Sequence, residues 1–241
     1  MRSGWYTVRT ALIAPVFVVV TGVLAAFIAV MASLQRDPPI VDRTLHWWSE
    51  FFLRIAGGSL ETSGQEHIDP DGQYLFVANH ESNLDVPVMF LTTGVPIRYL
   101  AKKELFKIPV FAQAMRGVGI IRTDRQAGKA AHGAINEGIA DARRRGHSLI
   151  IFPEGTRSET GELLPFKKGA FRIAITNGLP VIPISVEGTW EMWKPGAKVA
   201  YPGHVRTKVH PPIPTAGMEL TQITELRDQC REIIAADLGE S

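Results

Sequence analysis

A histidine and an aspartate in the stretch "VANHESNLDVPV", residues 77–88, could form a catalytic pair. His80 follows a short apolar run, and Asp85 comes five residues later. Neutral imidazole is a common general base near neutral pH, and a carboxylate that fixes its tautomer makes it more effective. In a continuous helix the two side chains would face different directions. A turn before a helix that begins at Asp85 would bring them together.

The same stretch also has a purely structural interpretation. Asn83 or Asp85 would cap a helix over residues 86–93, with Pro87 tolerated in its first turn, and His80 would lie in a loop. Seven histidines are present, and no other has an aspartate five residues further on. The spacing alone supports the two interpretations equally.

A second polar group lies in "IFPEGTRS", residues 151–158, where an apolar run meets a glycine turn. The turn would expose Glu154, Thr156 and Arg157, and backbone N–H groups near Gly155 would be able to hold an anion. Arginine offers a planar fork that matches phosphate or carboxylate. Glu154 and Arg157 would pair with each other if the loop were only structural. Its presence in the same chain as His80 and Asp85 favours a substrate site.

The elements that would position these groups alternate between strands and helices. We expect strands at 74–78, 118–122, 148–152 and 180–187, with a late one at 208–214. Helices are expected at 86–93, 102–117 with an interruption near Pro109, 131–142, 166–178 and 220–234. This order predicts an α/β fold with a mostly parallel central sheet flanked by helices.

In such a sheet, ligands bind beyond the carboxyl ends of the strands. Four polar clusters follow four of the expected strands, and they should converge there. The clusters are His80 with Asp85, residues 123–125, residues 153–157, and Glu187 with Gly188.

The N-terminal part of the chain predicts membrane attachment. Thr10–Gln35 contains no charged residue, and Arg9 and Arg36 bracket it. As a helix it would be roughly 39 Å long, enough for a hydrocarbon core of about 30 Å. This favours a membrane segment over a signal peptide or a core helix. A Trp-bearing amphipathic helix follows at 40–58, so a hairpin in one leaflet and a single span both remain open.

We therefore predict a membrane-anchoring helical hairpin over residues 1–60 and an α/β domain over residues 61–241. A net charge of +2 gives no support for nucleic-acid binding. The single cysteine, Cys230, excludes an internal disulfide and fits a reducing compartment.

Four ordered blocks from Tyr74 to Gly188 resemble the membrane glycerolipid acyltransferases, the family that includes 1-acylglycerol-3-phosphate acyltransferases. The blocks are "NHESNLD", "GIIRTDR", "FPEGTRS" and "VIPISVEG". The resemblance implies that His80 is the general base and that Asp85 orients it. It also implies a set of substrate-binding residues: Asn79, Ser82, Lys102 or Lys103, Arg125, Glu154, Gly155, Thr156, Arg157 and Pro183.

Within that set, the resemblance assigns the acceptor phosphate to Arg125, Arg157 and one of the two lysines, and the acyl-donor side to Pro183. The implied reaction needs no covalent intermediate, metal or cofactor. An acyl group would pass from acyl-CoA or acyl carrier protein to the hydroxyl of 1-acyl-sn-glycerol 3-phosphate, which makes phosphatidic acid. Membrane lipids would be partners, and the catalytic domain would lie on the cytoplasmic side of the inner membrane.

Three alternatives stay open at this point. The first is an acyltransferase whose acceptor is glycerol 3-phosphate or a lysophospholipid. An esterase or thioesterase would use His80 to activate water. A lipid-binding protein on the same fold would have no activity.

Overall fold

The computed structural model describes residues 2–34, 39–123 and 130–240, and within them seven strands form one sheet. The strand order is β1-β7-β6-β2-β5-β3-β4, and every neighbouring pair is parallel except β6 with β7. This confirms the predicted mostly parallel α/β fold. The strands are β1 (Gly58–Ser63), β2 (Leu75–Ala78), β3 (Ile97–Lys102), β4 (Ile121–Thr123), β5 (Ser148–Ile151), β6 (Val181–Glu187) and β7 (Gly203–Val209).

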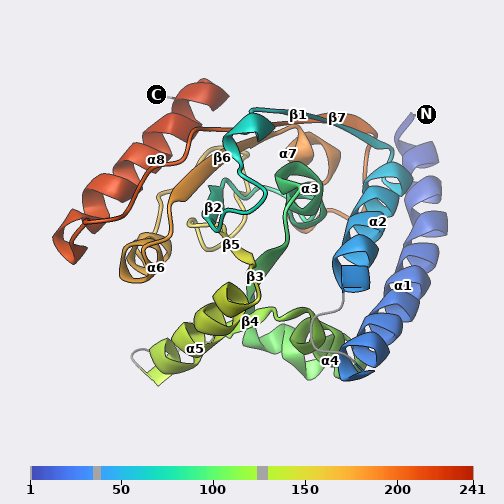
Figure 1. Cartoon of the computed structure of the whole chain (residues 1–241). Helices are drawn as coiled ribbons and strands as arrows, with labels where there is room; N and C mark the ends of the chain where they lie inside the picture. The colour runs from blue at the N-terminus through green and yellow to red at the C-terminus, as the bar shows by residue number, and fades with distance from the viewer. Residues whose placement is uncertain (1, 35–38, 124–129, 241) are drawn as a thin grey trace.

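Helices surround this sheet (Figure 1). The helices are α1 (Arg2–Leu34), α2 (Pro39–Ile55), α3 (Asp85–Thr93), α4 (Pro109–Val118), α5 (Ala130–Arg144), α6 (Gly169–Asn177), α7 (Thr189–Met192) and α8 (Ile223–Leu238). Short 3-10 turns are η1 (Gln65–His67), η2 (Lys103–Lys107) and η3 (Leu220–Gln222).

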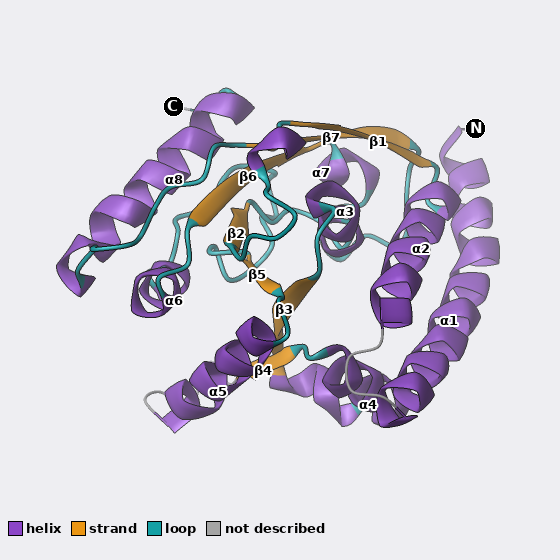
Figure 2. Cartoon of the chain, in the orientation of Figure 1, coloured by secondary structure: helices purple, strands orange, loops and turns teal. Residues whose placement is uncertain are grey.

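The alternation of side chains along the central strand β2 explains the two helical layers. Leu75 and Val77 join a core with α5, α6 and α8, whereas Phe76 and Ala78 join a second core with α2, α3 and α7. Because successive strand residues point to opposite faces, one apolar strand supplies both cores. Figure 2 shows the strands between these two groups of helices.

The expected helix over 102–117 is wrong in its first part. β3 continues to Lys102, and η2 follows. α4 begins at Pro109 and ends at Val118, and the next residue, Gly119, has a φ of 84°. Proline suits the first turn of a helix because it lacks only an N–H that would be unpaired there. β3 escaped detection because it contains Arg98, which is fully buried and donates to Asp42 at 2.8 Å.

The far edge of the sheet also differs from the expectation. β1 was not predicted, and the late strand β7 begins at Gly203 and ends at Val209 instead of covering 208–214. β1 pairs with β7 at the edge, and its residues alternate between half-buried and exposed positions. A polar edge strand of this kind lacks the apolar run by which strands are recognised.

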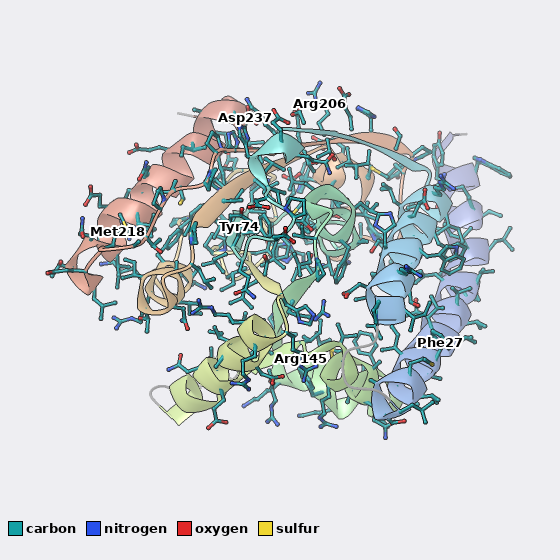
Figure 3. The ribbon with its side chains drawn as sticks, viewed as in Figure 1. Phe27, Tyr74, Arg145, Arg206, Met218 and Asp237 are labelled. Carbon is teal, nitrogen blue, oxygen red and sulfur yellow. The ribbon has the colours of Figure 1, made fainter. Side chains whose placement is uncertain are left out.

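The N-terminal helix α1 is continuous through Pro15 and is long and apolar enough to cross a membrane. One side packs on α4 and α2. The Phe17 ring stacks on Phe52 of α2 at 4.0 Å, and the Arg9 side chain donates to the carbonyl of Ala56, just after α2, at 2.7 Å. Its other side projects apolar side chains away from the fold (Figure 3). The predicted division after residue 60 falls within β1.

Candidate active site

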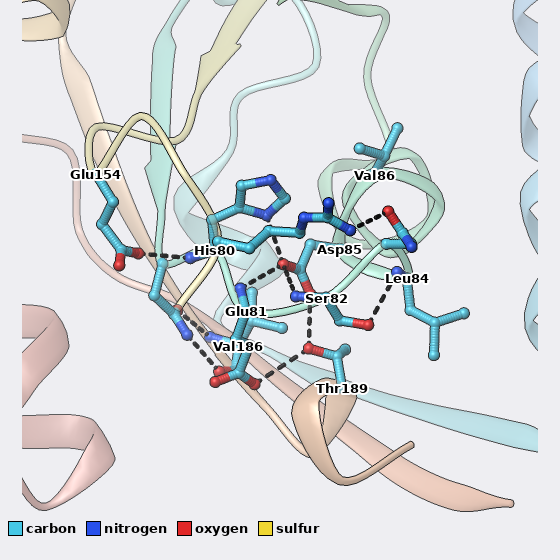
Figure 4. Close-up of polar contacts among 12 residues, drawn as sticks. His80, Glu81, Ser82, Leu84, Asp85, Val86, Glu154, Val186 and Thr189 are labelled. Carbon is cyan, nitrogen blue, oxygen red and sulfur yellow. Dashed lines mark hydrogen bonds and ion pairs between the residues drawn. The ribbon is translucent and has the colours of Figure 1, made fainter. Parts of the chain in front are cut away.

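The turn between β2 and α3 brings His80 and Asp85 into contact. His80 Nδ1 lies 2.7 Å from Asp85 Oδ2, and this oxygen also accepts the backbone N–H groups of Glu81 at 2.7 Å and Ser82 at 2.8 Å (Figure 4). Since Oδ2 accepts these amide hydrogens, it acts as the acceptor toward His80 as well. Nδ1 then carries the imidazole hydrogen, and Nε2 is the nitrogen able to take a proton.

The expected helix cap at this turn is wrong. Leu84 occupies the cap position of α3, and the first turn has no capping side chain. Helical side chains tilt toward the helix N-terminus, so the Asp85 carboxylate reaches back to the amides of the preceding loop. Asn83 is used elsewhere, because its Oδ1 accepts a 2.5 Å hydrogen bond from Arg157.

The second carboxylate oxygen of Asp85 contacts a threonine that follows β6. Thr189 Oγ1 lies 2.6 Å from Asp85 Oδ1 and 3.1 Å from Glu81 Oε1. Asp85 and Thr189 are fully buried, and Glu81 is 8% exposed. Burial, followed by the charge of Asp85, raises the pKa of Glu81 to about 8.

The His80 ring is held on its flat side by Phe152, which follows β5. The ring centroids are 4.1 Å apart, and the planes are inclined by 12°. The His80 side chain remains 18% exposed. The stacking and the Asp85 contact together restrict the imidazole to one orientation while leaving one edge accessible.

Glu154 binds backbone groups of the site and does not line the cavity beside His80. Oε1 accepts the backbone N–H of His80 at 2.6 Å, and Oε2 accepts that of Leu164 at 3.0 Å. The side chain is buried, and burial raises its pKa to about 7 despite these two hydrogen bonds. The alternative pairing of Glu154 with Arg157 does not occur, since Arg157 binds Asn83.

A cavity of about 1150 Å³ opens beside His80. Its walls are of two kinds. Apolar residues from α1, α2 and α4 include Leu24, Ile28, Trp48 and Met115. Basic residues include Lys102, Arg157, Lys167 and Arg172. A space of this composition suits a molecule that carries both an alkyl chain and an anionic group.

The sequence model of the family described as Acyltransferase matches residues 59–187 of the chain, which include His80, Asp85 and the loop after β5. The chain belongs to the acyltransferase family. This confirms the resemblance on which the site residues were chosen, and it makes the protein an O-acyltransferase.

Individual proteins that are similar to this chain are acyltransferases too. The 1-acyl-sn-glycerol-3-phosphate acyltransferase of Escherichia coli (strain K12) is 30% identical over 227 residues, which cover 92% of this chain and 91% of that protein. A chloroplastic 1-acyl-sn-glycerol-3-phosphate acyltransferase of Brassica napus is 34% identical over 234 residues, covering 92% and 66% respectively. The crystal structure of the 1-acyl-sn-glycerophosphate (LPA) acyltransferase PlsC from Thermotoga maritima is similar, with a TM-score of 0.79, 28% identity and coverage of 99% and 95%.

Three of the predicted binding residues of the acyltransferase do not point freely into the cavity, because they bind the backbone or lie buried in a strand. Both amide atoms of Asn79 bind the backbone of Val186, at 2.7 and 2.8 Å, and so extend the pairing of β2 with β6. The Ser82 hydroxyl donates to the carbonyl of Trp193 at 2.8 Å. Pro183 is buried within β6 and is not part of the cavity wall. Binding roles for these three residues stay predictions.

Other predicted residues lie on the cavity. Gly155, Thr156 and Arg157 line it, and so does Lys102, whereas Lys103 begins η2 and is not part of the wall. Arg125 and its neighbour Asp124 lie outside the described residues. Among the strand-end clusters, those after β2 and β5 meet at His80, and β4 lies at the sheet edge with Thr123 on the cavity.

The cluster after β6 contributes differently from the expectation. Glu187 is exposed and pairs with Arg206 at 2.6 Å, so it takes no part in the site. Gly188, with a φ of 92°, is the N-cap residue before α7 and turns the chain so that Thr189 reaches Asp85. Sequence reasoning missed Thr189 because a single threonine after a strand carries no signal of its own.

Lys167 was also missed, because "FKKG" reads as the exposed start of a helix. Its ammonium lies over the Gly155 turn: a Cβ placed on Gly155 would come within 2.6 Å of Lys167 Nζ. Gly155 has a φ of 74°. The glycine therefore serves two purposes, since it permits the turn and leaves room for a cation at the cavity wall.

Proposed function

We propose that this acyltransferase transfers an acyl group to the free hydroxyl of 1-acyl-sn-glycerol 3-phosphate and so makes phosphatidic acid. The observation that carries the proposal is the position of His80, with Nδ1 bound to Asp85, on a cavity whose walls are both basic and apolar. An acceptor with one phosphate and one acyl chain matches both kinds of wall. The relatives named for this acceptor support the same assignment.

In the proposed mechanism His80 acts as general base and then as general acid. Nε2 takes the hydroxyl proton as the acceptor oxygen attacks the thioester carbonyl carbon. The tetrahedral intermediate collapses by cleavage of the C–S bond, and the imidazolium returns its proton to the leaving thiolate. Asp85 holds the required tautomer and stabilises the imidazolium. The products are the new ester and a free thiol.

The acceptor phosphate would be held by the basic residues on the cavity wall. Arg157 has its planar fork fixed at one end by Asn83, which leaves other N–H donors for an oxyanion. Lys167 lies over the adjacent Gly155 turn and adds a second positive charge. Fixing the phosphate orients the hydroxyl relative to His80, an entropic contribution that can be large. Arg125, which the family resemblance assigns to the same role, stays a prediction.

The apolar N-terminal helices would hold the enzyme at its substrate. α1 exposes an apolar side, and α1, α2 and α4 also line the cavity near His80. A lysolipid would thus pass from the bilayer to the site without crossing water. We propose that α1 and α2 form the membrane-anchoring unit, that acyl-CoA or acyl carrier protein is the donor, and that the α/β domain faces the cytoplasm at the inner membrane.

An acceptor comparison with the full-length protein in membranes tests this function. Radiolabelled acyl-CoA is supplied with 1-acyl-sn-glycerol 3-phosphate, glycerol 3-phosphate or a zwitterionic lysophospholipid, and the labelled lipids are separated. We expect labelled phosphatidic acid as the main product, and none with His80→Ala. Equal transfer to the zwitterionic lipid would contradict the acceptor assignment. Release of free fatty acid without an acceptor would indicate a hydrolase, and absence of turnover would indicate a lipid-binding protein.

A further inference from the structure

A buried carboxyl group that the mechanism does not use lies next to Asp85. Glu81 is 8% exposed, and its Oε1 atom is 3.1 Å from Thr189 Oγ1. The same hydroxyl oxygen is 2.6 Å from Asp85 Oδ1. One threonine hydroxyl therefore lies between two carboxyl groups, one of which orients His80 (Figure 4).

A hydroxyl group has one hydrogen, so it cannot donate to both carboxyl groups at once. The shorter contact is with Asp85, which also accepts from His80 and two backbone amides and so acts as a carboxylate. If the Thr189 hydrogen goes to Asp85, the contact with Glu81 is a hydrogen bond only when Glu81 keeps its own proton and donates it. If both carboxyl groups were ionised, one of them would face the Thr189 oxygen with no hydrogen between the two oxygen atoms, which is costly in a buried position.

We infer that Glu81 is a positioning residue that acts as a neutral carboxylic acid, and that it fixes Asp85, and through it His80, by way of the Thr189 hydroxyl. The chain of hydrogen bonds runs from the Glu81 O–H to Thr189, from the Thr189 O–H to Asp85, and from His80 Nδ1–H to Asp85. Glu81 touches no reacting atom.

The groups that face Glu81 agree with a neutral state near pH 7. Burial is the main cause that raises its pKa, and the carboxylates of Asp85 on α3 and Glu191 on α7 raise it further. The Thr189 side chain and the Trp190 backbone act in the opposite direction, and the resulting pKa is about 8. Above that pH, Glu81 would ionise, compete for the Thr189 hydrogen and repel Asp85. Activity should then fall as His80 loses its fixed orientation.

This inference rests on the proposed role of His80 and is tested by the pH dependence of acyl transfer. kcat and kcat/KM are measured from pH 6 to pH 10 for the full-length enzyme with acyl-CoA and 1-acyl-sn-glycerol 3-phosphate. We expect wild-type activity to decline near pH 8, as Glu81 ionises. In Glu81→Gln, which cannot ionise, that decline should move up by at least about one pH unit. Glu187→Gln, a nearby exposed carboxylate outside the site, is the matched control and should keep the wild-type profile.

The hydroxyl link is tested with two substitutions of similar size. Thr189→Val should lower kcat about tenfold or more, with little change in KM for the acceptor. Thr189→Ser, which keeps the hydroxyl group, should have a kcat close to that of the wild type. Thermal unfolding of each variant establishes that it is folded. An unchanged alkaline decline in Glu81→Gln, or wild-type kcat in Thr189→Val, would overturn the inference.

These outcomes are separable from the proposed function. The same substrate concentrations are used for every variant. The pH profiles can therefore be compared with whichever acceptor the enzyme uses. If wild-type enzyme makes phosphatidic acid but Glu81→Gln keeps the alkaline decline, the positioning role of Glu81 is wrong and the proposed function stands. If another acceptor is preferred and the alkaline decline in activity still shifts to higher pH in Glu81→Gln, the acceptor assignment is wrong and the positioning role of Glu81 stands.

Discussion

The carboxyl group of Glu154 holds the backbone of His80 in position. Oε1 accepts the His80 N–H at 2.6 Å, while the His80 carbonyl accepts the N–H of Ser158 at 2.8 Å. The loops after β2 and β5 are therefore tied together on both sides of the histidine. A residue of the "FPEGTRS" block thus acts on the His80 backbone from a buried position.

Replacing Glu154 by glutamine should loosen this tie. An amide has one acceptor oxygen, so either the His80 or the Leu164 N–H would lose its partner and face an NH2 group. We expect kcat to fall about tenfold in Glu154→Gln, equivalent to about 1.4 kcal/mol, with a smaller change in KM. Steady-state kinetics measures this, and Glu159→Gln, an exposed carboxylate of the same loop, is the control. Wild-type kcat in Glu154→Gln would contradict the role of the tie.

Stability should decrease as the pH rises through the range in which the two buried glutamates ionise. In the folded protein the pKa of Glu154 is raised from 4.5 to about 7, and that of Glu81 from 4.5 to about 8. Between about pH 4.5 and pH 8 the folded state therefore binds more protons than the unfolded state, and stability falls with pH by on the order of a few kcal/mol.

The double variant Glu81→Gln, Glu154→Gln should lose most of that slope. Tm measured at pH 5, 6, 7 and 8 in detergent gives the comparison, with the double variant Glu159→Gln, Glu187→Gln as control. Parallel Tm curves for wild-type protein and the first double variant would show that these groups do not carry the pH dependence.

Lys167 should matter for the acceptor more than for the chemical step. Lys167→Gln removes a cation from the cavity wall, so KM for a phosphorylated acceptor should rise about tenfold while KM for the acyl donor changes less. Lys168→Gln is a matched control, because Lys168 is the next residue, is exposed and does not line the cavity. Equal effects of the two substitutions would exclude a specific role of Lys167 in acceptor binding.

A charge on the exposed side of α1 should weaken membrane attachment. Val19 is 63% exposed near the middle of this helix, and Val19→Lys should reduce vesicle binding about a hundredfold, because a lysine is costly in the hydrocarbon region. Co-flotation with vesicles measures this, and Ala236→Lys on the exposed face of α8 is the control. Unchanged flotation of Val19→Lys would contradict attachment through α1.

The sequence was sufficient for elements with a clear apolar pattern. The runs at β2, β5 and β6 predicted the centre of the sheet, and the blocks at their ends predicted that His80 and the loop after β5 would meet. β3 was missed because Arg98 interrupts its apolar pattern. In the folded chain, Asp42 on α2 and His147 before β5 are among the partners of this buried charge. No pattern within β3 itself contains that information.

The limits at the site have a similar cause. Thr189 and Lys167 lie at positions that only the folded chain creates: one follows a turn at Gly188, and the other lies over the glycine turn of a distant loop. Glu154 was found by its block, but its direction was not predictable, because a short loop can point a carboxylate to the cavity or to the backbone. The cap expected at Asn83 or Asp85 was wrong because α3 already begins at Asp85, whose carboxylate binds the backbone amides of Glu81 and Ser82 instead.

The most direct test of the central claim is the single-turnover rate of acyl transfer by His80→Ala. Enzyme in excess over labelled acyl-CoA is mixed with saturating 1-acyl-sn-glycerol 3-phosphate, so that binding and product release do not limit the rate. A general base contributes about 10²- to 10⁴-fold, and we predict a loss of about a thousandfold with the acceptor affinity retained. A His80→Ala rate within about threefold of wild type would contradict the account.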